Sequence, residues 1–242
     1  MTKLINTGSL PATFRISDLV RLSYGKETRR TAGYAVAKLL KEKKLIRLNG
    51  SMYSRVGNIF YIACAMYGGY IGLSSALSLY GLKEEVEANV YVCVNRSLRP
   101  ARVLDKIIVP VNTSSNSYGV QIMEHGSLVV QVSTYPKTIF DMLDRPRYAN
   151  YFDMYRALRL RPMRKEEWKE MLYYVASSRI ATARRIGHAL EGTAPAWFEA
   201  KLKELSEKRN GASFFTGHKP TGYDPKWRIF DSISMRRWTD AI

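Results

Sequence analysis

The sequence has few of the residues on which disulfide frameworks, metal centres and many catalytic sites depend. It contains two cysteines and three histidines in 242 residues. Cys64 and Cys93 lie in apolar stretches without a C-x-x-C spacing, which argues against a disulfide framework or structural zinc and fits a reducing cytoplasm. His125, His188 and His218 are scattered without metal-ligand spacing. Because a P-loop and a Gly-x-Ser-x-Gly motif are also missing, we expect no catalytic residue, metal or cofactor.

Charged side chains are missing from one stretch, residues 56–82, which is long enough to span a bilayer. Gly68-Gly69 interrupts this stretch, and serines and tyrosines lie within it. This pattern favours two short core helices joined at a glycine turn. Residues 1–11 lack the apolar segment of a signal peptide. We therefore expect a cytoplasmic protein without membrane contact; the alternative is a membrane-associated protein that uses residues 58–82.

Acidic residues are scarce relative to basic ones. The chain has 38 Lys and Arg against 21 Asp and Glu, which gives a formal net charge of +17 and a pI of about 9.9. The first 60 residues hold twelve of these cations and only three acids. A positive field of this kind favours polyanions such as DNA, RNA or an anionic membrane surface. The uneven distribution places the expected polyanion contact near the N-terminus.

The N-terminal segment has the outline of a helix-turn-helix. Residues 17–23 form a short amphipathic segment with Ser17 as its expected N-cap, and Tyr24-Gly25-Lys26 interrupts it. A longer helix is predicted over residues 27–44, because its apolar residues recur at helical spacing on one face. Two helices joined by a tight glycine turn, the second with a basic face, are typical of this DNA-binding motif.

A hairpin is predicted directly after the second helix. Residues 45–48 and 52–54 have the character of short strands, and the Asn49-Gly50-Ser51 segment between them contains a strong turn signal. A two-stranded hairpin in this position is typical of the wing in a winged helix-turn-helix. Residues 1–57 are therefore predicted to form a DNA-binding domain.

The exposed face of the second helix is the sharpest functional candidate. Arginine can bind the O6 and N7 atoms of guanine together, and the N-terminus of a helix offers backbone donors to phosphate. The alternatives are an ordinary solvated basic helix and an ordinary polar hairpin. The predicted DNA-binding residues are Lys26, Thr28, Arg29, Arg30, Thr31, Tyr34, Lys38 and Lys41 in the helix and Arg47, Asn49, Ser51 and Arg55 in the wing.

Residues 58–242 are predicted to form a larger mixed α/β domain, which makes the whole chain α+β. Strands are expected at 90–94, 107–111, 120–123 and 128–132, and helices at 135–143, 148–160, 164–175, 179–190 and 196–208. Residues 209–224 are expected to be an exposed loop, because they are rich in Gly, Lys and Pro.

Two clusters in this domain need interpretation. Asp141 and Asp144 lie three residues apart on one predicted helix, and we expect them to be structural because no third ligand is nearby. The second is a basic cluster, for which the sequence leaves three interpretations open: a solvated face, a further phosphate contact or a surface that binds a partner. Its members are Arg179, Arg184, Arg185 and His188.

Several segments, in the right order, resemble the AbiEi family of antitoxins, also described as transcriptional regulators of viral defence systems. Residues 17–48 resemble the N-terminal domain of the family, and Gly50 with Tyr53 resembles its wing-closing Gly and Tyr, with one extra residue between them. The later similar segments are 72–77 with Gly81-Leu82, where Tyr80 replaces a common His; 136–141, where Lys137 replaces the usual acid; 183–191; and 222–229 with Trp227.

This resemblance implies an N-terminal domain that binds inverted repeats in its own promoter and represses the operon. It also implies a C-terminal domain that neutralises a nucleotidyltransferase toxin, and no catalysis in this chain. We expect a monomer or weak dimer on double-stranded DNA, and direct contact with a toxin is left open. A stand-alone winged-helix transcription factor is the first alternative, and a DNA-processing enzyme is the second.

Overall fold

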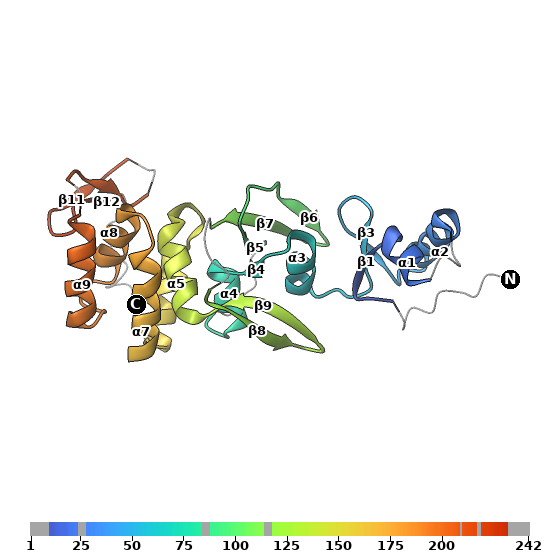
Figure 1. The fold of residues 1–242 in the computed structure, drawn as a ribbon, viewed down its shortest axis with the longest axis horizontal. Coiled ribbons are helices and arrows are strands. Elements are labelled where there is room, and N and C mark those ends of the chain that lie inside the picture. Colours follow the sequence, from blue (N-terminus) through green and yellow to red (C-terminus); the bar gives the residue numbers. More distant parts are fainter. Residues whose placement is uncertain are drawn as a thin grey trace.

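The computed structural model describes residues 10–23, 28–83, 88–113, 118–208, 210–216 and 219–231. The molecule is elongated, and three parts follow one another along its long axis (Figure 1). A small N-terminal unit lies at one end, a mixed sheet lies in the middle, and helices with a second small sheet lie at the other end. The mixed α and β content agrees with the predicted α+β class.

The N-terminal unit, residues 10–55, combines two helices with an antiparallel sheet of strand order β1-β3-β2. It has an apolar core of its own, in which the rings of Phe14 and Tyr53 lie 5.9 Å apart and pack with Leu19, Val36 and Leu39. The predicted domain boundary lies just after this unit. Its elements are β1 (Thr13–Arg15), α1 (Ile16–Leu22), α2 (Arg29–Lys41), β2 (Ile46–Arg47) and β3 (Met52–Ser54).

The start of α1 differs from the prediction. Ser17 lies inside the helix and is not its N-cap; Arg15 takes that position, and its N–H donates to the Asp18 carboxylate at 2.7 Å. Strand β1 was not predicted, because three residues are too few to show an alternating pattern, and it is formed by pairing with β3. The predicted turn at residues 24–26 lies outside the described residues.

A six-stranded sheet of order β6-β7-β5-β4-β9-β8 forms the middle of the molecule. Strands β5 and β7 are parallel, as are β4 and β9, and the other neighbours are antiparallel. Val90 and Val92 pack on α3, whereas Tyr91 and Val111 face the core around α5, as alternation along a strand requires. The elements are α3 (Ile59–Tyr67), β4 (Tyr70–Ile71), α4 (Leu73–Leu79), β5 (Asn89–Val94), β6 (Ala101–Val103), β7 (Lys106–Asn112), β8 (Val120–His125) and β9 (Leu128–Ser133).

The uncharged stretch 56–82 contains α3 and α4, so the prediction of two short core helices is confirmed. Gly68 ends α3 with a φ of +66°, a conformation that favours glycine. A Cβ on Gly69 would lie 2.1 Å from the carbonyl oxygen of Cys93, so only glycine fits where the chain enters β4. Within the described residues, no helix is both long and apolar enough to cross a membrane.

The remaining helices and a three-stranded sheet of order β10-β12-β11 form the far end of the molecule. Their shared core contains Trp168, Phe198 and Trp227, and a Cβ on Gly187 would lie 2.2 Å from the Trp227 ring. The elements are α5 (Tyr135–Asp144), the 3-10 helix η2 (Pro146–Tyr148), α6 (Tyr151–Leu160), α7 (Lys165–Ala176), α8 (Ile180–Ala189), α9 (Ala196–Ser206), β10 (Ser213–Phe214), β11 (Gly222–Asp224) and β12 (Ile229–Asp231).

The predicted order of strands followed by helices is confirmed, with helix ends shifted by a few residues. The prediction of an exposed loop over 209–224 is right for the exposure of most described residues and wrong for the absence of strands. Both β10 and β11 lie in this range and pair with β12, and the side chain of Phe215 is fully buried. Gly, Lys and Pro are uncommon in strands, so the composition of this segment predicted a loop. The segment forms strands because β12, which comes later in the chain, pairs with both β10 and β11.

Candidate nucleic-acid interface

Helix α2 has one buried face and one basic face. Ala32, Val36 and Leu39 are buried in the core of the N-terminal unit. The helix contains no acidic residue and lies at the outer end of the molecule, away from the central sheet (Figure 1). The basic face is therefore not used in packing against the sheet. The exposed residues at helical spacing on this face are Arg30, Tyr34, Lys38 and Lys41.

The N-terminus of α2 is held by two threonines. The Thr31 N–H donates to Oγ1 of Thr28 at 3.2 Å, and the Thr28 N–H donates to Oγ1 of Thr31 at 3.0 Å. This reciprocal arrangement is a capping box. Because the Thr31 hydroxyl also donates to the Thr28 carbonyl, both side chains are engaged in the cap. Both side chains therefore position the start of α2, and their contact with DNA stays a prediction.

Arg29 and Arg30 occupy the first two positions of the capped helix, and both are exposed. The guanidinium carbon of Arg30 lies 5.9 Å from the centroid of the Tyr34 ring, and Tyr34 is 66% exposed. This cation–π contact keeps the guanidinium on the helix surface. The first backbone N–H groups of a helix have no intrahelical acceptor, so they are suited to phosphate. The guanidinium groups of Arg29 and Arg30 lie beside these backbone N–H groups, and each can donate two hydrogen bonds to a base edge or a phosphate.

The C-terminal end of α2 carries further lysines, and a single acidic residue, Glu42, lies beside them. Glu42 caps this end and lies 2.9 Å from Lys44 and 4.0 Å from Lys38. Lys44 is the closer partner, and its hydrogen bond lowers the pKa of the exposed Glu42 carboxyl. Lys38 and Lys41 therefore keep a positive field along the exposed face.

The predicted wing is a hairpin that packs against the central part of the molecule. Gly50 adopts a φ of +61° at the turn, as the Asn-Gly signal suggested. Leu48 packs against the core around α3. A cavity of about 330 Å³ lies between the hairpin and α3, and it is lined by Arg15, Asn49, Gly50, Ser51, Met52, Met66 and Tyr67.

The structure divides the predicted wing residues into two groups. All four side chains are exposed; Asn49 and Ser51 also line the cavity beside α3, whereas Arg47 lies on β2 and Arg55 follows β3. Arg15 joins the hairpin because β1 pairs with β3, and sequence reasoning missed it because β1 was not predicted. The predicted contact Lys26 lies outside the described residues.

The second basic cluster is not a surface, and this prediction is wrong. Arg184 is 3% exposed and donates to the carbonyl of Gly211 at 2.7 Å and to Oγ of Ser213 at 3.1 Å. Arg185 donates through Nε to the Phe214 carbonyl at 3.0 Å. Arg179 is the exposed member of the four. Arg184 and Arg185 attach α8 to β10 and to the segment before it, because the Gly211 and Phe214 carbonyls and the Ser213 hydroxyl accept their hydrogen bonds.

His188, the fourth member of that cluster, lies between two carboxylates. Its Nδ1 is 2.6 Å from Asp224, and its Nε2 is 3.4 Å from Asp231. Burial lowers the pKa of His188, but the two carboxylates outweigh this effect and raise it above the ordinary 6.5. The imidazolium therefore ties α8 to β11 and β12.

This clamp predicts a pH-dependent stability. A raised folded-state pKa means that His188 contributes its full stabilisation below about pH 6.5 and loses it as the pH rises through the higher folded value. We expect the melting temperature to fall more steeply over this window in the wild type than in His188→Gln. Thermal unfolding at a series of pH values measures this difference, and parallel profiles for the two proteins would contradict it.

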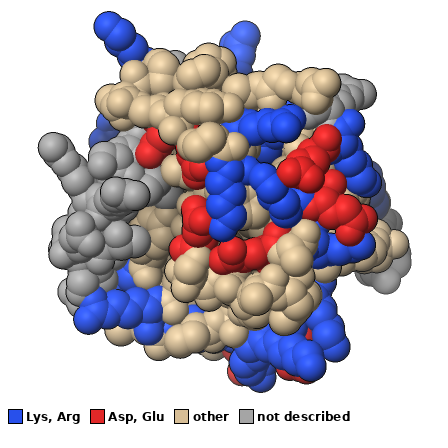
Figure 2. Space-filling model, turned by 90° about the vertical axis from the view of Figure 1, so that its left-hand side faces the viewer, with Lys and Arg blue, Asp and Glu red and all other residues tan. Residues whose placement is uncertain are grey.

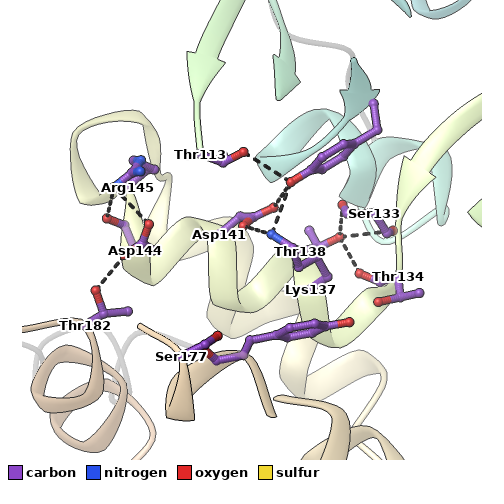
Figure 3. Close-up of polar contacts among 12 residues, drawn as sticks. Thr113, Ser133, Thr134, Lys137, Thr138, Asp141, Asp144, Arg145, Ser177 and Thr182 are labelled. Atoms are coloured by element: carbon purple, nitrogen blue, oxygen red, sulfur yellow. Dashed lines mark hydrogen bonds and ion pairs between the residues drawn. The ribbon is translucent and has the colours of Figure 1, made fainter. Parts of the chain in front are cut away.

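Asp141 and Asp144 are engaged by neighbouring side chains of the protein core. Asp141 forms a fully buried ion pair with Lys137, one turn earlier on α5, and accepts a hydrogen bond from Tyr70 at 2.9 Å. Figure 3 shows Lys137 and Asp141 pointing toward each other, with Thr113 close by. Asp144 accepts from the Thr182 hydroxyl at 2.6 Å. These contacts fit the structural role expected for both carboxylates.

No protein-family model and no curated protein matches this sequence. Among solved structures, the chain is similar to the crystal structure of the Rv2827c protein from Mycobacterium tuberculosis, with a TM-score of 0.65. The alignment covers 97% of this chain and 91% of that chain at 12% sequence identity. At this identity the likeness shows a shared fold alone.

Proposed function

We propose that this chain is a sequence-specific DNA-binding repressor whose N-terminal unit is a winged helix-turn-helix. The observation that carries the proposal is the basic face of α2, which is not used in packing and begins with Arg29 and Arg30. Helix α1, helix α2 and the β2–β3 hairpin follow one another in the order that this motif requires. In this arrangement α2 is the recognition helix and the hairpin is the wing.

The residues of the interface have different tasks under this proposal. Arg29 and Arg30 at the start of α2 read base edges, because forked donors distinguish guanine in the major groove. Lys38 and Lys41 further along the helix contact phosphates, which gives affinity without sequence information. Arg47 and Arg55 of the hairpin reach the adjacent backbone or minor groove.

The resemblance to the AbiEi family supports a more specific form of the proposal. In this form the repressor binds inverted repeats upstream of its own gene and neutralises a nucleotidyltransferase toxin. The neighbouring reading frame tests it directly: co-expression with this chain should relieve growth inhibition by a nucleotidyltransferase encoded there. If no such enzyme is encoded next to this gene, a stand-alone transcription factor of the same fold is favoured.

A salt titration tests the phosphate contacts. Lys41→Ala should weaken binding to all duplexes alike and reduce the slope of log affinity against log salt by about one unit. Fluorescence anisotropy with a specific and a random duplex measures both slopes. Lys169→Ala, an exposed lysine on α7, is the matched control and should leave the slope unchanged. An equal reduction in both variants would show a general charge effect and contradict a contact at Lys41.

A further inference from the structure

The cavity of about 330 Å³ between the hairpin and α3 is built by two parts of the molecule, and we call it the wing cleft. Met66 and Tyr67, the last two residues of α3, line one side. The cleft therefore lies where the N-terminal unit meets the central sheet (Figure 1). The lining residues from the N-terminal unit are Arg15, Asn49, Gly50, Ser51 and Met52.

Several hydrogen-bond donors of the wing cleft have no partner in the part of the chain that the structure describes. The carboxamide of Asn49 and the hydroxyl of Ser51 are exposed and bond to no described residue. In the turn, the N–H groups of Leu48 and Met52 donate to carbonyls, whereas those of Gly50 and Ser51 have no acceptor among the described residues. A ligand with several acceptor oxygens can therefore receive hydrogen bonds from side chains and backbone together.

The charge of the wing cleft is positive. Arg15 is its charged lining residue, and its exposed side chain forms no ion pair with a described residue. The Asp18 carboxylate accepts a hydrogen bond from the Arg15 N–H, but Asp18 does not line the cleft. An anion in the cleft therefore meets a guanidinium and no lining carboxylate at short range.

The loop between β5 and β6 adds a second arginine beside the wing cleft. The Tyr67 hydroxyl donates to the Arg99 carbonyl at 2.9 Å, which fixes this loop next to a residue that lines the cleft. Leu98 of the loop packs on the same core as Leu48 of the hairpin. Arg99 is exposed, and no described carboxylate pairs with it. Arg15 and Arg99 are therefore both close to the Tyr67 side chain.

The opposite end of the molecule has a different arrangement of charge. Figure 2 shows Lys and Arg side chains interspersed with Asp and Glu side chains there. On α9, for example, Lys201 lies 2.6 Å from Glu204. Positive charge at that end is offset by neighbouring acids, whereas Arg15 and Arg99 keep theirs available for a ligand.

We propose that the wing cleft and Arg99 together bind a phosphodiester group of the duplex that α2 contacts. This inference rests on the proposed function, and it adds the central sheet to an interface that was predicted within residues 1–57. A phosphodiester offers one negative charge and acceptor oxygens, which suit two guanidinium groups and free N–H groups. Duplex DNA is the source of the phosphate because the turn that lines the cleft belongs to the proposed wing. Bound DNA therefore holds the N-terminal unit against the central sheet.

Two substitutions remove the positive charge at exposed positions. Arg15→Gln keeps a long polar side chain, and Arg99→Ala keeps the carbonyl to which Tyr67 donates. Arg159→Ala, which removes an exposed arginine of α6, is the matched control. Fluorescence anisotropy measures the affinity of each full-length protein for the specific duplex over a range of salt concentrations. Duplexes in which one phosphate at a time is replaced by a neutral methylphosphonate locate the contact.

The variant with both Arg15→Gln and Arg99→Ala should lose roughly tenfold in affinity, because charge-assisted hydrogen bonds are lost. Its slope of log affinity against log salt should fall by about one unit. One methylphosphonate position should weaken the wild type by a similar factor and leave the double variant unaffected, and the control should behave as the wild type. An unchanged slope, with binding that still depends on Arg29 and Arg30, would overturn this inference and leave the proposed function intact.

Inorganic phosphate separates a free anion from DNA as the source of the phosphate. Added to full-length protein labelled with ¹⁵N-glycine, it should shift the amide signal of Gly50 in the wild type and not in Arg15→Gln, whereas chloride at equal ionic strength should have no such effect. The same shift without any loss of duplex binding in the double variant would identify a free anion as the ligand and overturn the DNA contact. A wild type that binds no duplex would overturn the inference and the proposed function together.

Discussion

Replacing Lys137 with methionine is expected to lower the free energy of unfolding by about 3 to 5 kcal/mol. Lys137 and Asp141 are each 1% exposed, and the lysine also donates to the Tyr70 hydroxyl at 3.1 Å. Methionine has nearly the same length and would fill the space between the rings of Tyr70, Phe140 and Tyr174. The loss therefore comes from the buried carboxylate, which would remain without its cation.

Urea unfolding followed by circular dichroism measures this effect. The control is Lys137→Met combined with Asp141→Leu, which removes both charges. We expect the double variant to recover most of the lost stability, because replacing a whole buried ion pair by apolar side chains is often neutral or favourable. The Tyr70 hydroxyl keeps Thr113 at 3.4 Å as a partner. A double variant as unstable as the single one would show that packing, and not the unpaired charge, sets the loss.

Arg29→Ala and Arg30→Ala should each cost about 1 to 3 kcal/mol in binding to the specific duplex, because each removes a forked donor from the proposed recognition helix. The loss for a random duplex should be smaller, since a single phosphate contact carries no sequence information. Fluorescence anisotropy on both duplexes gives the two free energies. Both side chains are exposed, so we expect the two variants to fold as the wild type does.

The matched control for this prediction is Arg30→Lys. Lysine keeps the positive charge but cannot place two parallel donors on one base. We therefore expect Arg30→Lys to bind random DNA like the wild type and to lose part of its preference for the specific site. If it kept the full preference, Arg30 would act through charge alone, and base recognition would have to lie elsewhere.

The sequence predicted those parts of the fold that depend on local patterns. The long helix predicted over residues 27–44 is observed as α2, because its buried residues recur at helical spacing. The Asn-Gly turn likewise predicted the hairpin with β3. Strands β1, β4, β6, β10 and β11 were missed, since two or three residues carry no periodicity and each becomes a strand only by pairing with another segment.

The sequence also predicted only those features of the candidate site that depend on local patterns. The basic stripe of α2 follows from spacing within one helix, so its exposure could be expected. The burial of Arg184 could not, because it depends on Ser206, Gly211 and Ser213, which come more than twenty residues later. The capping box of Thr28 and Thr31 was not predicted, because the usual pattern has Glu or Gln, and not Thr, at the third helical position.

The most direct test of the central claim is a footprint of the full-length protein on the DNA upstream of its own gene at several salt concentrations. The account predicts one or more protected sites, bound roughly a thousandfold more tightly than random duplex, with affinity that falls as salt rises. The combined Arg29→Ala and Arg30→Ala variant should lose this protection. Uniform weak binding without a protected site, or protection that survives in this variant, would contradict the assignment of α2 as the recognition helix.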